Sequence, residues 1–326
     1  MNQIFYVSNY LSKEIHVWKI NYFGILKLIQ IVHTSGYCKS IIIHPKKPYL
    51  YIGVRPNYKV IVYYINNRGL LNEIGQSKIL GSPTYLNILN DKLYCASYKD
   101  SNLSVSLITY TGITEYPMQL LSEVTNCHSI NIDIINNTLL IPCLTEDKIR
   151  IYDIHKNGLI NLKYTFISVK PGSGPRHIAF HSNGKYCYII NELNGTVNIL
   201  KINNNKKYSI LHSIKIFPKE IESNSIWSSD IHITPNNKWL YCTDRHANII
   251  IHFKILDNGK NLKLISYKLT EHQPHGFNID KNGKFLISAG QKSNFISVYK
   301  INQTNGKLLF MSRYKSGIEP IWISFL

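Results

Sequence analysis

Three of the six arginines in this 326-residue chain lie beside short apolar segments typical of β-strands: Arg55, Arg176 and Arg245. A guanidinium keeps its charge at physiological pH and forms paired hydrogen bonds to phosphate or carboxylate groups. Three guanidiniums around one site would therefore suit an anionic ligand. Acidic residues such as Glu192 and Asp230 occupy comparable positions. The arginines and acids could equally pair with one another as structural ion pairs, so both interpretations stay open.

An internal repeat indicates which elements would position these side chains. In each unit a first strand leads into a polar turn of Asn, Gly, Lys and Pro, and then come a second strand and a β-branched third strand. Equivalent residues of the second strand recur at intervals of 43 to 53 residues, about the length of one propeller blade. These residues are Leu50, Leu93, Leu139, Cys187, Leu240 and Leu286. With hardly any helical periodicity, the chain is predicted to be all-β: a seven-bladed β-propeller with four antiparallel strands per blade, 1–326 being a single domain.

The seventh blade is predicted to be shared between the two ends of the chain. Six units are complete, and residues 321–325 would supply the first strand of the remaining one. Residues 5–7 and 15–18 would supply its second and third strands. Pairing the N- and C-terminal strands would close the ring and remove two exposed sheet edges.

This architecture predicts one polar mouth of the central channel. The first and second strands of a blade are antiparallel neighbours, so the first strand begins where the second one ends. Because the first strands line the channel, polar side chains at these positions should converge. The strand starts are Lys39, Thr84, His128, Arg176, His177, Asp230 and His275, and the strand ends are Arg55, Tyr98, Glu192, Asp244, Arg245, Gln291 and Lys292.

The composition excludes several classes of protein. The chain is 44% hydrophobic and only 17% charged, which argues against disorder. No apolar stretch approaches the roughly 18 residues of a membrane span, and the first residues lack the features of a secretion signal. The formal charge of +18 could attract nucleic acid or an anionic membrane. The lysines are scattered without a compact basic run, so we expect neither nucleic acid nor a membrane as a partner. We also expect a monomer.

The cysteine spacing predicts free thiols and no metal site. Six cysteines show neither Cys-x-x-Cys spacing nor a zinc-type Cys/His cluster. We therefore expect a cytoplasmic protein. No serine-nucleophile elbow, phosphate loop or His-Glu-x-x-His pair is present, so no cofactor is expected.

Eight short motifs resemble one known family, in order and over essentially the whole chain. They are Gly53–Pro56, Gly81–Thr84, Cys127–Ser129, Gly174–His177, Asn191–Leu193, Asp230–Pro235, Asp244–Arg245 and Ala289–Ser293. They are similar to the bacterial 6-phosphogluconolactonases of the seven-bladed propeller, cycloisomerase 2 type. The resemblance implies a carboxylic-ester hydrolase that converts 6-phospho-D-glucono-1,5-lactone to 6-phosphogluconate in the oxidative pentose phosphate pathway. The substrate would be this small anionic phosphosugar lactone.

The same resemblance implies roles for the mouth residues. The catalytic His, Arg, Glu and Arg of the related fungal carboxy-muconate lactonising enzymes match His128, Arg176, Glu192 and Arg245 by motif. Glu192 is the favoured general base and His128 the less favoured one, while the two arginines would stabilise the oxyanion and hold the phosphate. The predicted substrate-binding residues are Arg55, His177, Asp230, His275, Gln291 and Lys292.

Two positions depart from the family pattern, and two other functions remain open. Asp133 and Ile134 replace the family's usual Ser-Pro before the turn of the third blade, a change typical of surface drift. His275 stands where the resemblance leads us to expect arginine, which predicts a charge that varies with pH near neutrality. A non-catalytic propeller that binds protein partners would instead need apolar anchors around the mouth. A lactonase or cycloisomerase for another anionic sugar acid or a muconate-like substrate would not depend on phosphate.

Overall fold

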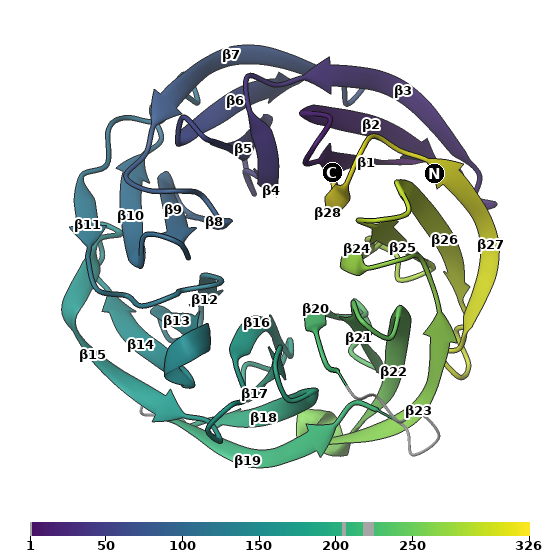
Figure 1. Cartoon of the computed structure of the whole chain (residues 1–326). Helices are drawn as coiled ribbons and strands as arrows, with labels where there is room; N and C mark the ends of the chain where they lie inside the picture. The colour runs from purple at the N-terminus through teal and green to yellow at the C-terminus, as the bar shows by residue number, and fades with distance from the viewer. Residues whose placement is uncertain (1, 204–206, 218–224) are drawn as a thin grey trace.

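The computed structural model describes residues 2–203, 207–217 and 225–326. In these ranges the strands form seven four-stranded antiparallel sheets, arranged as blades around a central axis (Figure 1). The only helical elements there are the 3₁₀ turns η1 (Leu144–Glu146) and η2 (Asp257–Gly259). The prediction of a seven-bladed β-propeller is therefore confirmed.

Each blade has the same order of strands from the axis outward. The inner strands are β4 (Tyr37–Ile43), β8 (Tyr85–Leu89), β12 (Asn131–Asp133), β16 (Pro175–Phe180), β20 (Ser228–Ile233), β24 (Pro274–Ile279) and β28 (Pro320–Phe325). The second strands are β5 (Tyr49–Arg55), β9 (Lys92–Ser97), β13 (Thr138–Cys143), β17 (Tyr186–Asn191), β21 (Trp239–Asp244), β25 (Phe285–Gly290) and β1 (Gln3–Asn9). The third strands are β6 (Lys59–Ile65), β10 (Asn102–Leu107), β14 (Lys148–Ile154), β18 (Thr196–Ile202), β22 (Ile249–Leu256), β26 (Phe295–Ile301) and β2 (Glu14–Ile20). The outer strands are β7 (Leu71–Lys78), β11 (Gln119–Leu121), β15 (Ile160–Ser168), β19 (Tyr208–Lys215), β23 (Asn261–Leu269), β27 (Leu308–Lys315) and β3 (Leu26–His33).

The apolar core lies between the blades. Each of its clusters combines residues from two neighbouring sheets, and alternate residues of one strand face opposite neighbours. On β13, for example, Leu139 and Ile141 pack toward the blade of β8, whereas Leu140 packs toward the blade of β16. Strands that are covered on both faces need continuous apolar runs, which explains why the second and third strands stand out in the sequence.

The ring closes between the two ends of the chain. β28 pairs with β1, with Phe5 opposite Phe325 and Val7 opposite Ile323. The sheet order β28-β1-β2-β3 confirms the predicted shared blade, and Figure 1 shows both termini in it. Every inner strand is thereby fixed beside its neighbours around one channel.

Tyrosines of the second strands connect adjacent blades. Each donates its buried hydroxyl to a glycine carbonyl in an outer turn of the next blade. The pairs are Tyr6 with Gly69, Tyr51 with Gly112, Tyr94 with Gly158, Tyr188 with Gly259 and Tyr241 with Gly306. Gly69 has a φ of 77° and sits tightly against Ile4, so glycine is required there. This repeated contact was not predicted from the sequence.

Two further findings concern the cysteines and helices that could span a membrane. All six cysteines are free and buried, as the spacing predicted. In the described part of the chain, no helix is long and apolar enough to cross a membrane.

Candidate active site

β-Bulges aim side chains of the inner strands into one mouth of the channel. In five of these strands the pairing with the second strand shifts register near the strand start. The shifts span Arg176 in β16, Ser229 and Asp230 in β20, His275 in β24, Ile321 in β28, and Lys39 in β4. A bulge leaves the extra residue unpaired and redirects its side chain. The predicted convergence at the mouth is thus produced by local irregularities as well as by the ring.

Glu192, which follows β17, is the centre of the charged cluster. Its Oε2 lies 2.7 Å from Nε of Arg176 and 2.9 Å from Nη2 of Arg245, and all three side chains are largely buried. Its Oε1 accepts a hydrogen bond of 3.2 Å from the indole Nε1 of Trp227. The Arg245 guanidinium stacks on the Trp227 ring at 3.8 Å. Asp244 fixes this segment by accepting the Trp227 backbone N–H at 3.0 Å.

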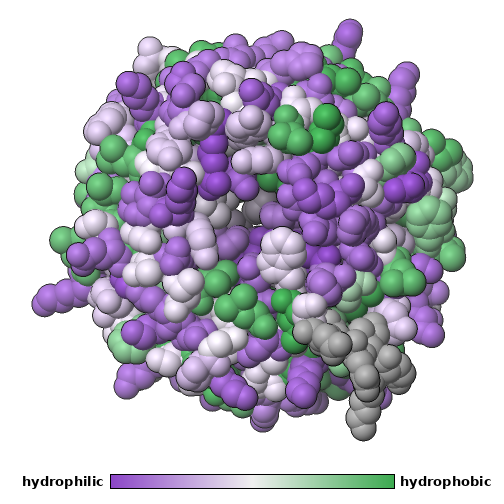
Figure 2. All heavy atoms as spheres, viewed as in Figure 1, coloured by the Kyte–Doolittle hydropathy of each residue, from purple (hydrophilic) through white to green (hydrophobic). Residues whose placement is uncertain are grey.

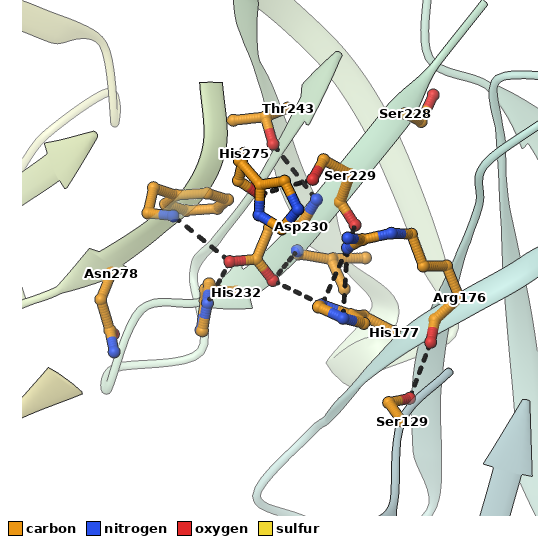
Figure 3. A network of polar contacts seen from close by, with 12 residues as sticks. Ser129, Arg176, His177, Ser228, Ser229, Asp230, His232, Thr243, His275 and Asn278 are labelled. Atoms are coloured by element: carbon orange, nitrogen blue, oxygen red, sulfur yellow. Dashed lines mark hydrogen bonds and ion pairs between the residues drawn. The ribbon is translucent and has the colours of Figure 1, made fainter. Parts of the chain in front are cut away.

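A second layer of polar residues holds Arg176 from behind (Figure 3). Nη1 of Arg176 donates to the Ser229 carbonyl and lies 3.1 Å from Nε2 of His177. Nδ1 of His177 lies 2.8 Å from Oδ1 of Asp230, whose Oδ2 lies 3.2 Å from Nε2 of His232. With the Nδ1–H of His177 donating a hydrogen bond to the Asp230 carboxylate, Nε2 of His177 carries no proton. The lone pair of Nε2 then accepts a hydrogen bond from Arg176.

The pKa values of this layer agree with that arrangement. Burial and the nearby Arg176 lower the pKa of His177 to about 4, against the opposing effect of Asp230. Burial alone would raise the pKa of Asp230, but His232 and His177 hold it well below its usual value. At neutral pH the pair is therefore a neutral imidazole bonded to a carboxylate. His177 and Asp230 were predicted to contact substrate, and the structure places them beneath Arg176.

Two further imidazoles face the same mouth, and both are neutral. Burial, with Arg176 as the next cause, lowers the pKa of His128 and of His275 well below the usual value. Nδ1 of His275 lies 3.2 Å from the Ile321 carbonyl. Nδ1 of His128 is buried without a hydrogen-bond partner in the described part of the chain. The predicted pH-dependent charge of His275 near neutrality is wrong, because burial, and after it the cationic neighbours, hold the pKa of His275 well below its usual value.

The remaining predicted residues lie on other sectors of the rim. Nη2 of Arg55, at the end of β5, donates to the carbonyl of Pro83 at 2.9 Å. Lys292 is half-exposed and forms a 2.8 Å ion pair with Glu319. Gln291 donates to the other oxygen of the same carboxylate at 3.3 Å. Gln291 and Lys292 thus have a protein partner, whereas Arg55 contacts only uncharged oxygens among the described residues.

Aromatic rings close the channel below the mouth. The rings of Tyr85, His177 and Trp322 lie 5.3–6.1 Å apart, centroid to centroid. A cavity of about 340 Å³ lies against this plug, lined also by His232 and Asn278. Figure 2, viewed along the axis, shows an opening at the centre of the ring that is bordered largely by hydrophilic residues.

Trp227 belongs to the charged cluster and was not predicted from the sequence. Trp227 precedes β20 in a segment without strand pattern, and only its proximity to Asp230 in the sequence could have indicated it. Among the residues that the structure describes, no three His, Cys, Asp or Glu side chains form a group that could hold a metal ion. The mouth is lined by guanidinium, imidazole and carboxylate groups, which suit acid–base chemistry on an anionic substrate.

Comparisons with known proteins agree with this architecture. The family model described as "Lactonase, 7-bladed beta-propeller" matches residues 4–325. A protein of Blochmanniella pennsylvanica named 6-phosphogluconolactonase is 45% identical, covering 100% of this chain and 98% of that one. A protein of Sodalis glossinidius with the same name is 44% identical, covering 100% and 99%.

Solved structures support the fold. The periplasmic gluconolactonase of Pseudomonas aeruginosa superposes with a TM-score of 0.91 at 20% identity, covering 100% of this chain and 99% of that one. A protein of Lactobacillus plantarum gives a TM-score of 0.91 at 19% identity, with complete coverage of both chains. With the family model and the full-length relatives above, these findings establish that the chain belongs to the seven-bladed β-propeller lactonase family.

Proposed function

We propose that this protein is a 6-phosphogluconolactonase, which hydrolyses the ring ester of 6-phospho-D-glucono-1,5-lactone to 6-phosphogluconate. The observation that carries the proposal is the cluster at the channel mouth, where Arg176 and Arg245 meet one carboxylate near the neutral imidazole of His128, whose Nδ1 has no hydrogen-bond partner among the described residues. Full-length relatives that carry this name support the choice of substrate. A protein-binding scaffold would present apolar anchors at the mouth, and the described residues there are mainly charged and polar.

His128 is the general base in this proposal. Hydrolysis begins when water attacks the lactone carbonyl carbon and gives up a proton. A neutral imidazole with a free nitrogen can accept that proton, and such a base is typically worth roughly 10²–10⁴ in rate. Both oxygens of Glu192 already have partners. The sequence favoured Glu192 as base; the geometry supports a positioning role for it instead, holding the two arginines.

The arginines stabilise the tetrahedral oxyanion that forms at the carbonyl oxygen. Arg176 is 1% exposed and held on three sides by Glu192, His177 and Ser229, so it need not reorganise during the reaction. Loss of one such donor costs about 3 kcal/mol in other enzymes. When the bond between the carbonyl carbon and the ring oxygen breaks, the imidazolium of His128 returns its proton to that oxygen. The carboxylic acid product then releases one proton to solvent.

A lactonase assay tests the proposal directly. Freshly generated 6-phosphogluconolactone is mixed with the full-length protein, and acid release is corrected for spontaneous hydrolysis. We expect saturable acceleration, and a much weaker effect on unphosphorylated glucono-1,5-lactone. Hydrolysis of the phosphorylated lactone at the spontaneous rate would overturn the assignment. Equal rates on both lactones would favour a lactonase for another sugar acid.

The proposal includes a cytoplasmic location, supported by six free, buried cysteines of the kind found in reducing compartments. That the protein is a single-domain monomer without nucleic-acid or membrane partners stays a prediction.

A further inference from the structure

Two cations on the rim have no acidic partner in the described part of the chain. Lys39 comes from the bulge of β4, and Arg55 comes from the end of the adjacent β5. The described ion pairs include neither residue. This differs from the other cations of the rim, since Arg176 and Arg245 share Glu192, and Lys292 binds Glu319.

Arg55 is anchored by uncharged groups of the next blade. Its Nη2 donates to the Pro83 carbonyl at 2.9 Å and to Oγ1 of Thr84 at 3.0 Å. Its Nε is buried without a partner among the residues that the structure describes. The contacts therefore fix the position of the guanidinium but leave its charge without compensation.

Lys39 lies within the field of the other mouth cations. Its Nζ is 4.6 Å from the centroid of the Tyr10 ring. Burial lowers the pKa of Lys39 to about 8, and Arg55, Arg176 and Arg245 lower it in the same direction, while Glu319 opposes them. An ammonium that is repelled by three guanidiniums and lacks a counter-ion is costly to bury, and an anion would remove that cost.

The charge of the mouth indicates how much negative charge would be accepted. Arg176 and Arg245 share the carboxylate of Glu192, and Glu319 is paired with Lys292, so neither carboxylate is paired with Lys39 or Arg55. The imidazoles of His128 and His275 are neutral at neutral pH. An excess of positive charge therefore remains, and it is concentrated on the β4 side. A phosphate monoester is a dianion at neutral pH, which matches this excess.

The pair lies on a different side of the channel from the other two arginines. In the ring of blades, β4 lies across the channel from β16 and β20 (Figure 1). In 6-phosphogluconolactone the phosphate on C6 and the carbonyl at C1 lie on either side of the ring oxygen, so two different groups of the mouth can contact them. We propose that Lys39, together with Arg55, binds the phosphate group of the substrate, while Arg176 and Arg245 contact the carbonyl on the opposite side. This inference rests on the proposed function and adds to it the residues that select a phosphorylated lactone.

Steady-state kinetics of Lys39→Met on two substrates test the inference. We expect KM for 6-phosphogluconolactone to rise about 10- to 100-fold, as for the loss of a charge-assisted hydrogen bond. The kinetics with glucono-1,5-lactone should stay unchanged, and Lys39→Arg should restore most of the affinity. Lys46→Met is the matched control, because Lys46 is an exposed lysine in the turn at the far end of β4.

Three outcomes would overturn the inference. An equal loss on both lactones would show that Lys39 supports the whole mouth, for instance through Tyr10. Unchanged kinetics on both lactones would show that Lys39 has no role in recognition. Failure of Lys39→Arg to recover affinity would show that the charge is not what matters.

A separate arm distinguishes this inference from the proposed function. If the wild-type protein does not accelerate hydrolysis of the phosphorylated lactone, the proposed function fails. Calorimetry with inorganic phosphate then tests the phosphate site independently of catalysis. Binding by wild type that is lost in Lys39→Met supports the site, and equal or absent binding in both proteins refutes it.

Discussion

The two sides of the channel mouth differ in how their charges are compensated. On the β16 and β20 side, Arg176 and Arg245 share Glu192, and a second layer through His177 and Asp230 supports Arg176. On the β4 side, Lys39 and Arg55 have no carboxylate partner in the described part of the chain. On the β16 and β20 side the charges are paired before substrate binds, whereas on the β4 side the phosphate of the substrate supplies the missing negative charge.

This difference separates two tasks. Groups that stabilise a developing charge work best when they are fixed in advance, because no reorganisation is then needed during the reaction. Groups that select a ligand gain from an unsatisfied charge, since the ligand relieves an unfavourable field and thereby binds more tightly. We therefore expect substitutions on the first side to change kcat, and substitutions on the second side to change KM.

The largest effect is expected for the base. His128→Asn should lower kcat by roughly 10²–10⁴, because the proposed proton acceptor is lost. Glu192→Gln should lower kcat by a smaller factor, because the amide oxygen can still contact the arginines. Stopped-assay measurement of kcat for both variants, with thermal melting to confirm folding, makes the comparison.

The dependence of kcat on pH tests the same assignment of the base. Burial and Arg176 lower the pKa of His128 well below its usual value, so the free base predominates at neutral pH. For wild type, kcat should be flat around neutrality and fall only in acid. If Glu192→Gln loses more activity than His128→Asn, the roles are reversed and Glu192 is the base.

Much of the fold could be predicted because the chain repeats. Blades that are covered on both faces need apolar second and third strands, and turns such as 182–185 and 281–284 mark each hairpin. The closure was predictable from the lone strands at the two ends. The tyrosine-to-glycine contacts between blades were not, since a buried phenol and a distant glycine have no fixed spacing in the sequence.

The sequence indicates which residues lie at the mouth of the channel more readily than it indicates what each of them does there. Antiparallel pairing places Arg176, Glu192 and Arg245 at one rim, and this follows from topology alone. Whether a residue faces the mouth or lies behind it depends on the bulges, which the sequence does not mark. His177 and Asp230 support Arg176 and also line the cavity next to Tyr85 and Trp322, and their contact with substrate stays a prediction.

A smaller effect is expected from the second layer. Asp230→Asn removes the carboxylate that fixes the tautomer of His177, so a fraction of the molecules carries the proton on Nε2, which then cannot accept a hydrogen bond from Arg176. We expect kcat to fall about 10- to 100-fold, the range for misplacing a reacting group by up to ~1 Å. KM for the phosphorylated lactone should change little, since Asp230 is remote from Lys39 in the ring.

A neighbouring variant identifies this as a positioning effect. His232 also contacts Asp230 but is more exposed, so His232→Gln serves as the matched change in the same cluster. It should leave kcat within a few-fold of wild type. A loss in Asp230→Asn that appears in KM alone would contradict the division between the two sides.

The smallest effect is a pH dependence confined to the β4 side. The pKa of Lys39 is lowered to about 8 by burial, with Arg55, Arg176 and Arg245 acting in the same sense and Glu319 and the Tyr10 ring as its other neighbours. A lysine carries its charge below its pKa. Phosphate affinity should therefore be full at pH 7 and fall by up to about tenfold per pH unit above pH 8.

Calorimetric titration with methyl phosphate between pH 7 and 9.5 measures this fall, because a phosphate monoester has a second pKa of about 6 and is mainly a dianion over this range. Burial and Arg176 also lower the pKa of Arg245, to about 9, so the mouth holds a second group that could lose charge in this range. Lys39→Arg separates the two. If Lys39 is responsible, the variant binds phosphate equally at both ends of the range; if the fall persists, Arg245 causes it, and the two sides of the mouth are less independent than their partners indicate.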